Sequence, residues 1–173
     1  MFLIESNRIG LLPLSHENLL LFRESRALLN QKLGLDAHFW DLEKDVWAEI
    51  EDALDSFWIP NTSQNPDYEW FTSWEIILKA QNISIGGIGF GGLPNEEGFT
   101  FVGYSIDKKF RNQGIVTEAL VLIQQWAFQN PTTKAIRASV HLENIPSNRV
   151  LEKLHYQTIG VEKDLLIWEL KKA

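Results

Sequence analysis

The residues best suited to chemistry lie in one stretch, residues 103–120, with the sequence GYSIDKKFRNQGIVTEAL. The pattern predicts a strand, a short polar loop and a helix that opens at Gln113–Gly114. The first turn of a helix leaves main-chain N–H groups unpaired at the positive end of the helix dipole. Gly114 has no side chain to keep an anion from those groups, and Arg111 adds a positive charge just upstream. These features predict main-chain binding of a phosphate or pyrophosphate group.

A strand–helix–strand unit must position this turn. The sequence predicts a strand over Phe99–Ile106, a helix from Gly114 to about residue 129 that ends before Pro131, and a strand over Ala135–His141. If the two strands pair in parallel, the crossover between them is right-handed and both strands end on the ligand side. A splay between the strands at that edge would admit a long ligand.

The remaining elements predict an α+β fold in a single domain spanning residues 1–173. Ser15 is a typical N-cap for a helix that runs to about Gln31. We expect a turn-rich, mobile loop over Pro60–Pro66. The other expected elements are a strand pair over 2–14, a helix over 43–58, a hairpin of strands 71–80 and 83–90, a helix over 146–154, and strands over 156–161 and 165–170.

Composition excludes several functional classes. The 173 residues carry a formal net charge of −7, with a pI near 5.1, which argues against nucleic acid as a partner. The absence of cysteine excludes disulfides and thiolate chemistry, and the four histidines show no metal-ligand spacing, so no metal is expected. No apolar segment approaches membrane-spanning length, and the N-terminus lacks a basic leader region, so we expect a cytoplasmic protein without membrane contact.

Two motifs, in this order, resemble the signatures of the GNAT superfamily of N-acetyltransferases. Residues 111–116, RNQGIV, are similar to its acetyl-CoA motif, Arg/Gln-x-x-Gly-x-Gly/Ala. Residues 144–156, NIPSNRVLEKLHY, are similar to its second signature, Asn-x-x-Ser-x-x-x-x-Glu-Lys-x-Gly-Phe. The Thr117-Glu118-Ala119 continuation most resembles the ribosomal-protein N-terminal acetyltransferase branch. The resemblance spans essentially the whole chain and is sharpest from Trp74 to Tyr156.

The resemblance implies that acetyl-CoA is the co-substrate. It implies a cofactor-binding core over about residues 72–156 and acceptor-side helices over about residues 15–60. The pyrophosphate would lie on main-chain N–H groups, and the pantetheine arm would follow the strand before the loop. The cofactor-binding residues that the resemblance implies are Ser105, Ile106, Arg111, Asn112, Gln113, Gly114, Ile115, Val116, Thr117 and Asn144.

The resemblance also implies direct attack of an amine on the thioester, with a general base and a general acid. Ser147 is the candidate acid, although serine is also favoured at a helix start because it satisfies an unpaired N–H there. Asn144 is similarly open to a purely structural capping role. The base is left among Glu75, Glu96, Glu97 and water.

The sequence departs from the family pattern in four places, the last of which is a pair of residues. Val116 stands where the motif has Gly or Ala, and Phe101 stands where many relatives carry a glutamate. The tyrosine that serves as acid in many relatives falls at Leu151. His155–Tyr156 replaces the usual Gly-Phe pair, which indicates a variation in packing.

A second glycine-rich stretch, GIGFGG at residues 87–92, fits the G-x-G-x-x-G pattern of dinucleotide sites. A strand follows it where that fold needs a helix, so the dinucleotide interpretation is rejected. These glycines are expected to let a strand twist or another backbone approach.

Aromatic residues are dense between residues 39 and 74. Most are expected to be core, yet aromatic walls with acidic residues nearby would suit a cationic amine. The acidic residues meant here are Asp36, Asp41, Asp67 and Glu69.

The sequence therefore predicts an acetyl-CoA-dependent N-acetyltransferase that acts on a primary amine, either a protein N-terminus or a small cationic molecule. Two alternatives stay open. The chain would otherwise be a non-catalytic acyl-CoA-binding module, or a dimeric structural or regulatory protein with a vestigial cleft. A homodimer is also compatible with the catalytic interpretation.

Overall fold

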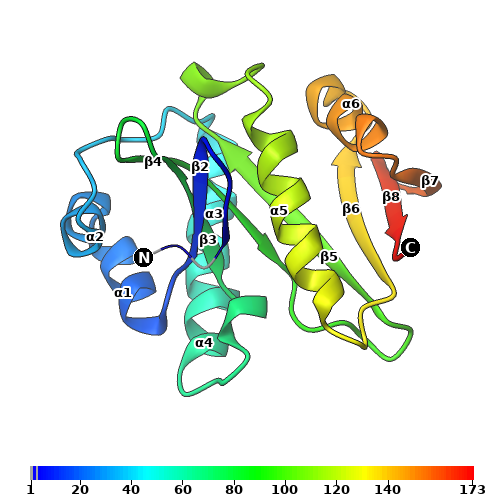
Figure 1. Ribbon diagram of the computed structural model, residues 1–173, viewed down its shortest axis with the longest axis horizontal. Helices are drawn as coiled ribbons and strands as arrows, with labels where there is room; N and C mark the ends of the chain where they lie inside the picture. Colours follow the sequence, from blue (N-terminus) through cyan, green and yellow to red (C-terminus); the bar gives the residue numbers. More distant parts are fainter. Residues whose placement is uncertain (1, 3) are drawn as a thin grey trace.

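A computed structural model describes residues 2 and 4–173 of the chain. The described residues form one open sheet of eight strands in the order β1-β2-β3-β4-β5-β6-β8-β7 (Figure 1). All neighbouring strands are antiparallel except β5 and β6, which are parallel. The strands are β1 (Ile4–Glu5), β2 (Ile9–Pro13), β3 (Ser73–Leu78), β4 (Ile83–Phe90), β5 (Phe99–Ile106), β6 (Ala135–His141), β7 (Gln157–Glu162) and β8 (Leu165–Lys171). The predicted α+β fold class is confirmed.

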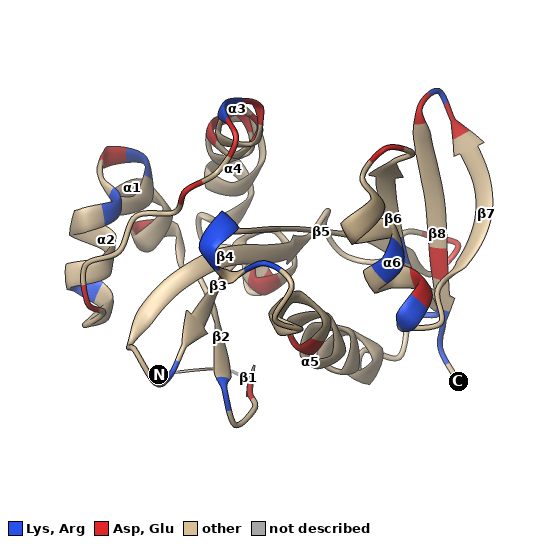
Figure 2. Cartoon of the chain, turned by 90° about the horizontal axis from the view of Figure 1, so that it is seen from above, with Lys and Arg blue, Asp and Glu red and all other residues tan. Residues whose placement is uncertain are grey.

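The helices lie on both faces of the sheet (Figure 2). One hydrophobic core joins α5 and Leu151 of α6 to β2–β6, and a second core joins α1, α2 and α3 to the opposite face. The helices are α1 (His16–Glu24), α2 (Arg26–Leu33), α3 (Lys44–Ala53), α4 (Ile59–Thr62), α5 (Ile115–Gln129) and α6 (Ile145–Lys153), with short 3-10 helices at Tyr68–Trp70 and Lys108–Phe110.

The helix predicted from Ser15 to about Gln31 is wrong as a single element. Ser15 caps α1 as expected, by accepting a hydrogen bond from the Asn18 N–H. The chain then breaks at Ser25, whose extended backbone (φ −167°, ψ 130°) ends α1 and whose side chain caps α2 at the Ala27 N–H. A serine that bonds the backbone locally competes with helix continuation, and here it divides one helix into two.

The loop predicted to begin at Pro60 is also wrong at its start. The helical path continues from α3 through a π turn at Leu54–Trp58 into α4, which ends at Thr62. Pro60 lies inside this continuous helical path, where it cannot donate a main-chain hydrogen bond to the preceding turn. The Ile59 N–H reaches back five residues to the Leu54 carbonyl, and this wider turn precedes the proline.

The strand–helix–strand unit agrees with its prediction. β5 and β6 have the expected bounds, and α5 begins directly after Gly114. The two strands pair only between Phe99–Phe101 and Ala135–Arg137, at their N-terminal ends. Beyond that point the strands have no pairing, so the sheet is splayed at the edge where both strands end.

Candidate functional site

The turn before α5 presents a run of unpaired main-chain donors. Asn112 (φ 60°) and Gly114 (φ 74°) adopt left-handed conformations, which turn successive N–H groups toward one side. Within residues 2 and 4–173, no backbone or side-chain acceptor takes a hydrogen bond from the N–H groups of residues 112–117. Unpaired main-chain N–H groups at a helix start are the donors that a phosphate group needs, so phosphate binding at this turn stays a prediction.

Arg8 adds a cation to this turn that the sequence did not point to. Its Nη1 donates to the Gln113 carbonyl at 3.0 Å, and its Nε donates to Glu118 of α5 at 2.7 Å. A Cβ added at Gly114 would lie 3.6 Å from the Arg8 guanidinium. Burial disfavours the Glu118 carboxylate, but hydrogen bonds from Ser6 and Arg8 outweigh it and lower its pKa.

Arg111 is placed differently from its prediction. Its guanidinium donates two hydrogen bonds of 2.8 Å to Glu43, the residue before α3, and its Nε contacts the Ile106 carbonyl at 3.3 Å. The hydrogen bonds that Arg111 donates to the Glu43 carboxylate raise the pKa of Arg111. The side chain thus ties the loop to the start of α3, and the unpaired donors of the turn are main-chain N–H groups.

The splayed edge of β5 offers further main-chain groups. Gly91 donates to the Phe101 carbonyl and Asp107 donates to the Ile85 carbonyl, so odd-numbered residues of β5 bond to β4. In an antiparallel ladder the alternate residues then point their N–H and C=O groups to the other side. The free groups of the splay are therefore the Val102 carbonyl, the N–H and C=O of Tyr104 and the Ile106 N–H, while the Ile106 carbonyl accepts from Arg111. The predicted Ser105 uses its main chain to pair with Gly87.

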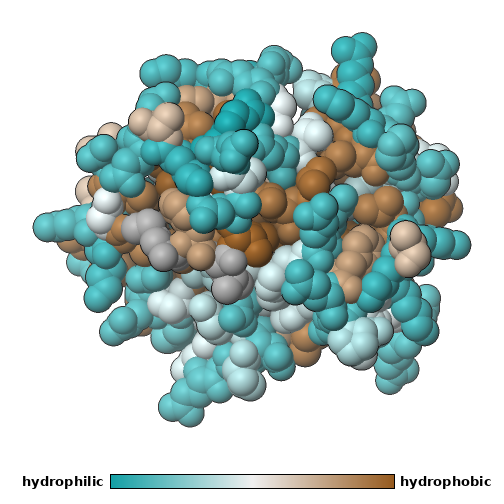
Figure 3. Space-filling view, in the orientation of Figure 1, coloured by the Kyte–Doolittle hydropathy of each residue, from teal (hydrophilic) through white to brown (hydrophobic). Residues whose placement is uncertain are grey.

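The start of α6 brings Asn144 and Ser147 to the other border of the splay. Asn144 caps the helix, because its Oδ1 accepts the Ser147 N–H at 3.3 Å. Next to Ser147 lies the hydroxyl of Tyr104, which is buried and has no hydrogen-bond partner of normal geometry within the described chain. Burial raises the pKa of Tyr104, and the neighbouring Ser147 side chain opposes part of that rise. Seen from the α5 side, apolar surface runs between α5 and α6 (Figure 3).

Asn148 is a structural residue of α6 that sequence reasoning missed. Its amide donates to the His141 carbonyl, and its Oδ1 accepts the indole N–H of Trp168 at 2.9 Å. These bonds fix the start of α6 to the end of β6 and to the middle of β8. Leu151, at the position of the family tyrosine, is fully buried in the core and supplies no acid.

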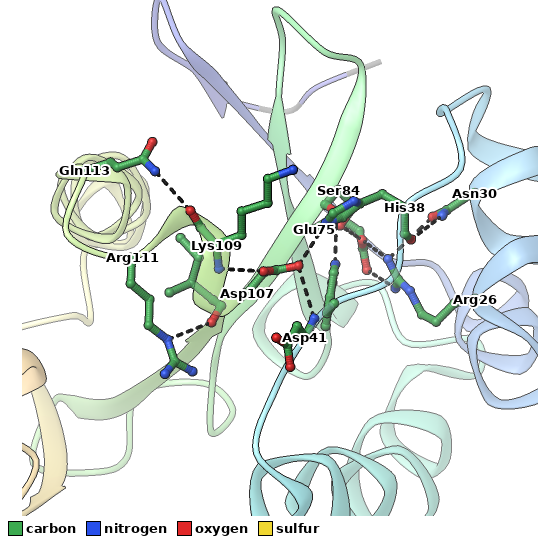
Figure 4. A network of polar contacts seen from close by, with 12 residues as sticks. Arg26, Asn30, His38, Asp41, Glu75, Ser84, Asp107, Lys109, Arg111 and Gln113 are labelled. Atoms are coloured by element: carbon green, nitrogen blue, oxygen red, sulfur yellow. Dashed lines mark hydrogen bonds and ion pairs between the residues drawn. The ribbon is translucent and has the colours of Figure 1, made fainter.

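Glu75, the first candidate base, is sealed in the interior. Its carboxylate has no exposed surface and accepts two hydrogen bonds of 2.8 Å from Arg26 and another from Ser84 (Figure 4). Arg26 in turn packs against the rings of Phe22 and Trp40. Both carboxylate oxygens are occupied, so the placement supports a structural ion pair rather than proton transfer.

Glu96 and Glu97 are exposed in the loop that precedes β5. The splay lies at the opposite end of this strand, near Tyr104. Five residues of extended chain from Phe99 to Tyr104 span about 16 Å, which places both carboxylates far from the splay. Neither residue is brought to the candidate site.

A cavity of about 500 Å³ lies on the opposite face of β4 and β5 from α5. Its floor is the β4–β5 pair, its roof is α3 with the π turn, and Ser139 of β6 places it beside the splay. Among the described residues that line it, Glu49 of α3 carries the one charged side chain. Glu49 is therefore a carboxylate at the site that sequence reasoning did not select, since nothing in its local pattern distinguishes it from other acids of α3.

Two other kinds of site are absent from residues 2 and 4–173. No group of three or more His, Asp or Glu side chains is arranged to hold a metal ion. No helix in this part of the chain has the length and apolar character needed to cross a membrane.

Comparison with known proteins identifies the family. A sequence model described as acetyltransferase (GNAT) domain matches residues 26–157, which is more than half of the chain. The protein therefore belongs to the GNAT acetyltransferase family, and its splayed, mostly antiparallel sheet is the GNAT fold.

Relatives and solved structures agree with this assignment. The uncharacterized N-acetyltransferase YjdG of Bacillus subtilis (strain 168) is 33% identical over 93 residues, which are 54% of this chain and 55% of YjdG. The chain spans about half the length of the curated relatives it matches. An acetyltransferase of the GNAT family from Bacillus anthracis gives a TM-score of 0.65 at 20% identity, over 99% of this chain and 98% of that one. RimL, a ribosomal-protein alpha-N-acetyltransferase in complex with coenzyme A, gives 0.70 at 15% identity over the same shares.

Proposed function

We propose that the protein transfers the acetyl group of acetyl-CoA to a primary amine, within a single catalytic domain of residues 1–173. The observation that carries this proposal is the run of unpaired N–H groups at residues 112–117, directly beside a splayed strand edge. A pyrophosphate needs the first feature, and an extended amide-bearing arm needs the second. The solved RimL structure contains coenzyme A, which supports the same ligand class here.

The residues present fit acetyl-CoA in both respects. The N–H groups of residues 112–117, with Arg8 beside them, would hold the pyrophosphate. The Val102 carbonyl, the N–H and C=O of Tyr104 and the Ile106 N–H would pair with the amides of the pantetheine arm, and Asn144 would contact it from α6. The bound co-substrate supplies an acetyl group activated as a thioester.

Direct transfer requires two proton movements, which the chain's residues assist. The amine nitrogen forms the bond to the acetyl carbon while the carbon–sulfur bond breaks. The nitrogen loses its proton to water at the cavity, and the departing thiolate gains a proton from the Ser147 hydroxyl, which then recovers a proton from water. Ser147 lies half-buried at the border of the splay, and the Tyr104 hydroxyl beside it can donate to the Ser147 oxygen.

Two measurements test the function. Acetyl-CoA should raise the melting temperature, because a ligand that binds the native state stabilises it. Release of the free thiol of CoA should then depend on an added primary amine. The absence of a thermal shift would refute the proposed co-substrate. A thermal shift without amine-dependent thiol release from any member of a broad panel would favour the non-catalytic binding module instead.

A further inference from the structure

Glycine occupies four of six neighbouring positions on one face of the β4–β5 pair. Gly87, Gly89 and Gly91 follow β4 at every second residue and lie opposite Ser105, Gly103 and Phe101 of β5. Because alternate residues of a strand share a face, these six residues form the floor of the cavity. The glycine-rich stretch that resembles a dinucleotide motif, together with Gly103, therefore leaves four of these six positions without a side chain.

The space around these glycines differs from one position to the next. A Cβ at Gly89 would lie 2.6 Å from the Thr72 carbonyl oxygen, and one at Gly87 would lie 2.9 Å from the Ser73 hydroxyl, so neighbouring atoms exclude side chains there. Gly103 has an ordinary backbone conformation, and a Cβ at that position would meet no atom within 4 Å. Glycine weakens the interior of a strand. The packing of the protein does not require a glycine at position 103. The open space above Gly103 is therefore a feature to be explained by what the cavity binds.

The borders of the strip are aromatic. Phe57 and Trp58 of the π turn and Trp40 of the preceding loop line the roof side of the cavity, and Phe101 borders the strip on β5. Trp40 is fixed by a hydrogen bond from its indole N–H to the Ser84 carbonyl. A flat slot between bare backbone and aromatic side chains accepts a planar ring more readily than a branched or fully hydrated chain.

The charge of the cavity is low. Of the described residues that line it, Glu49 alone is charged, and the remainder are aromatic, aliphatic, glycine or serine. A single carboxylate balances one ammonium group. A polyamine or an aminoglycoside carries several charges, and an apolar cavity would leave most of them without a partner.

We propose that this cavity is the acceptor site, and that the acceptor is a primary amine with one positive charge on a flat aromatic body. The inference rests on the proposed function, since it names the substrate class of the same site. The ring would lie on the strip at Gly103, and Glu49 would hold the ammonium group. Ser139 and Ser105 place the inner end of the cavity at the splay, where the acetyl group would be transferred.

A panel of amines gives the first test. With acetyl-CoA at saturation, phenethylamine and tryptamine should show kcat/KM values about tenfold or more above those of spermidine, kanamycin and a short peptide with a free N-terminus. A higher value for any of the last three would overturn the acceptor class while leaving acetyl transfer intact. If acetyl-CoA itself fails to bind, the proposed function fails. Calorimetric titration of phenethylamine into the free protein still tests the cavity, and no binding would overturn the inference.

Filling the strip gives the second test. Gly103→Leu places a side chain in open space, and it should raise the KM for phenethylamine about tenfold or more. The thermal shift with acetyl-CoA should be unchanged. Gly160→Leu is the matched control, because Gly160 is also a strand glycine whose Cβ would meet no atom within 4 Å, and it lies on β7. Equal KM values for the two variants would contradict the inference.

The carboxylate gives the third test. Glu49→Gln should raise the KM for phenethylamine about two- to fivefold, since an exposed charge pair contributes modestly. Glu51→Gln removes an exposed carboxylate of the same helix that does not line the cavity, and it should leave the KM unchanged. A loss of the same size in both variants would mean that general charge, rather than Glu49, attracts the amine.

Discussion

The guanidinium of Arg111 donates two hydrogen bonds, each 2.8 Å long, to the carboxylate of Glu43. This pair joins the loop before α5 to the residue before α3. The loop would bind phosphate, and α3 roofs the cavity proposed for the acceptor. A bidentate ion pair between residues 68 positions apart in the sequence thus connects the proposed phosphate-binding loop to the helix over the cavity.

Two further contacts strengthen this connection. The carboxylate of Asp107, at the end of β5, contacts the His38 ring at 2.9 Å and accepts the Asp41 N–H at 3.1 Å (Figure 4). Lys108 contacts the Asp41 carboxylate at 3.2 Å. Residues 38–43 are therefore held against residues 107–111 at several points, and displacement of one segment would disturb the other.

The Arg111–Glu43 pair predicts a pH-dependent contribution to stability. Hydrogen bonds from Arg111 lower the pKa of Glu43 to about 2. A lowered pKa in the folded state stabilises the fold above the unfolded pKa of about 4.3, and this contribution is lost as the pH falls toward 2. Because the pair is partly exposed, Glu43→Gln should lower the free energy of unfolding at pH 7 by about 1 kcal/mol or less.

Urea unfolding at pH 7, 5 and 4 measures this effect. The difference between Glu43→Gln and the wild type should shrink as the pH falls below 5. Glu51→Gln removes an exposed carboxylate of α3, and its free energy of unfolding should differ little from the wild type at any of these pH values. A Glu43→Gln difference that stays constant from pH 7 to pH 4 would contradict the assignment.

Local signals were sufficient to predict the strand–helix–strand unit. Gly114 marks the start of α5, Pro131 follows its end, and alternating apolar residues mark β5 and β6. Such signals act within a few residues, so a single sequence carries them. The break at Ser25 is also local, but a serine in a helical pattern predicts an N-cap and an exposed helix position equally well.

The features that the sequence did not reveal, the position of Arg8 and the burial of Glu75, depend on contacts between segments distant in the sequence. Arg8 reaches Gln113 and Glu118 across more than 100 residues of chain, and Glu75 meets Arg26 across 49. No spacing rule connects such pairs. The sequence shows that Glu75 is a carboxylate in a strand, and only the fold shows that the carboxylate is buried against an arginine.

The left-handed turn at Gly114 predicts a variant that separates ligand binding from folding. Gly114→Asp should abolish the thermal shift with acetyl-CoA, because it adds a carboxylate beside the N–H groups of the turn. The substitution also strains the backbone, at a cost of about 1–2 kcal/mol. Gly34→Asp is the control, since Gly34 has a similar φ of 69° and no atom within 4 Å of an added Cβ. The control should lose stability and keep the full thermal shift, and a shift lost in both variants would count against the phosphate site.

Ser147 and Tyr104 predict a pair of kinetic effects. Ser147→Ala should lower kcat and leave the thermal shift with acetyl-CoA nearly unchanged, because the hydroxyl is proposed to act on the departing thiolate. Tyr104→Phe removes the buried hydroxyl beside Ser147 and should lower kcat to a smaller extent. If the tyrosine acts through Ser147, the double variant should be no slower than Ser147→Ala alone. Multiplicative losses in the double variant would mean that the two hydroxyls act independently.

Glu75 and Arg26 predict a loss of stability without a specific loss of chemistry. Glu75→Gln leaves the buried Arg26 guanidinium without its counter-charge, so the free energy of unfolding should fall by about 3–5 kcal/mol. A double variant, Arg26→Met with Glu75→Leu, removes both charges and should recover a large part of that loss. Urea unfolding measures stability, and kcat per folded molecule measures chemistry. A general base would behave in the opposite way: kcat would fall by about 100-fold or more in both variants, including the restabilised one. The expected result is a kcat that follows the folded fraction, because a carboxylate that holds an arginine inside the protein stabilises the site without contacting the amine.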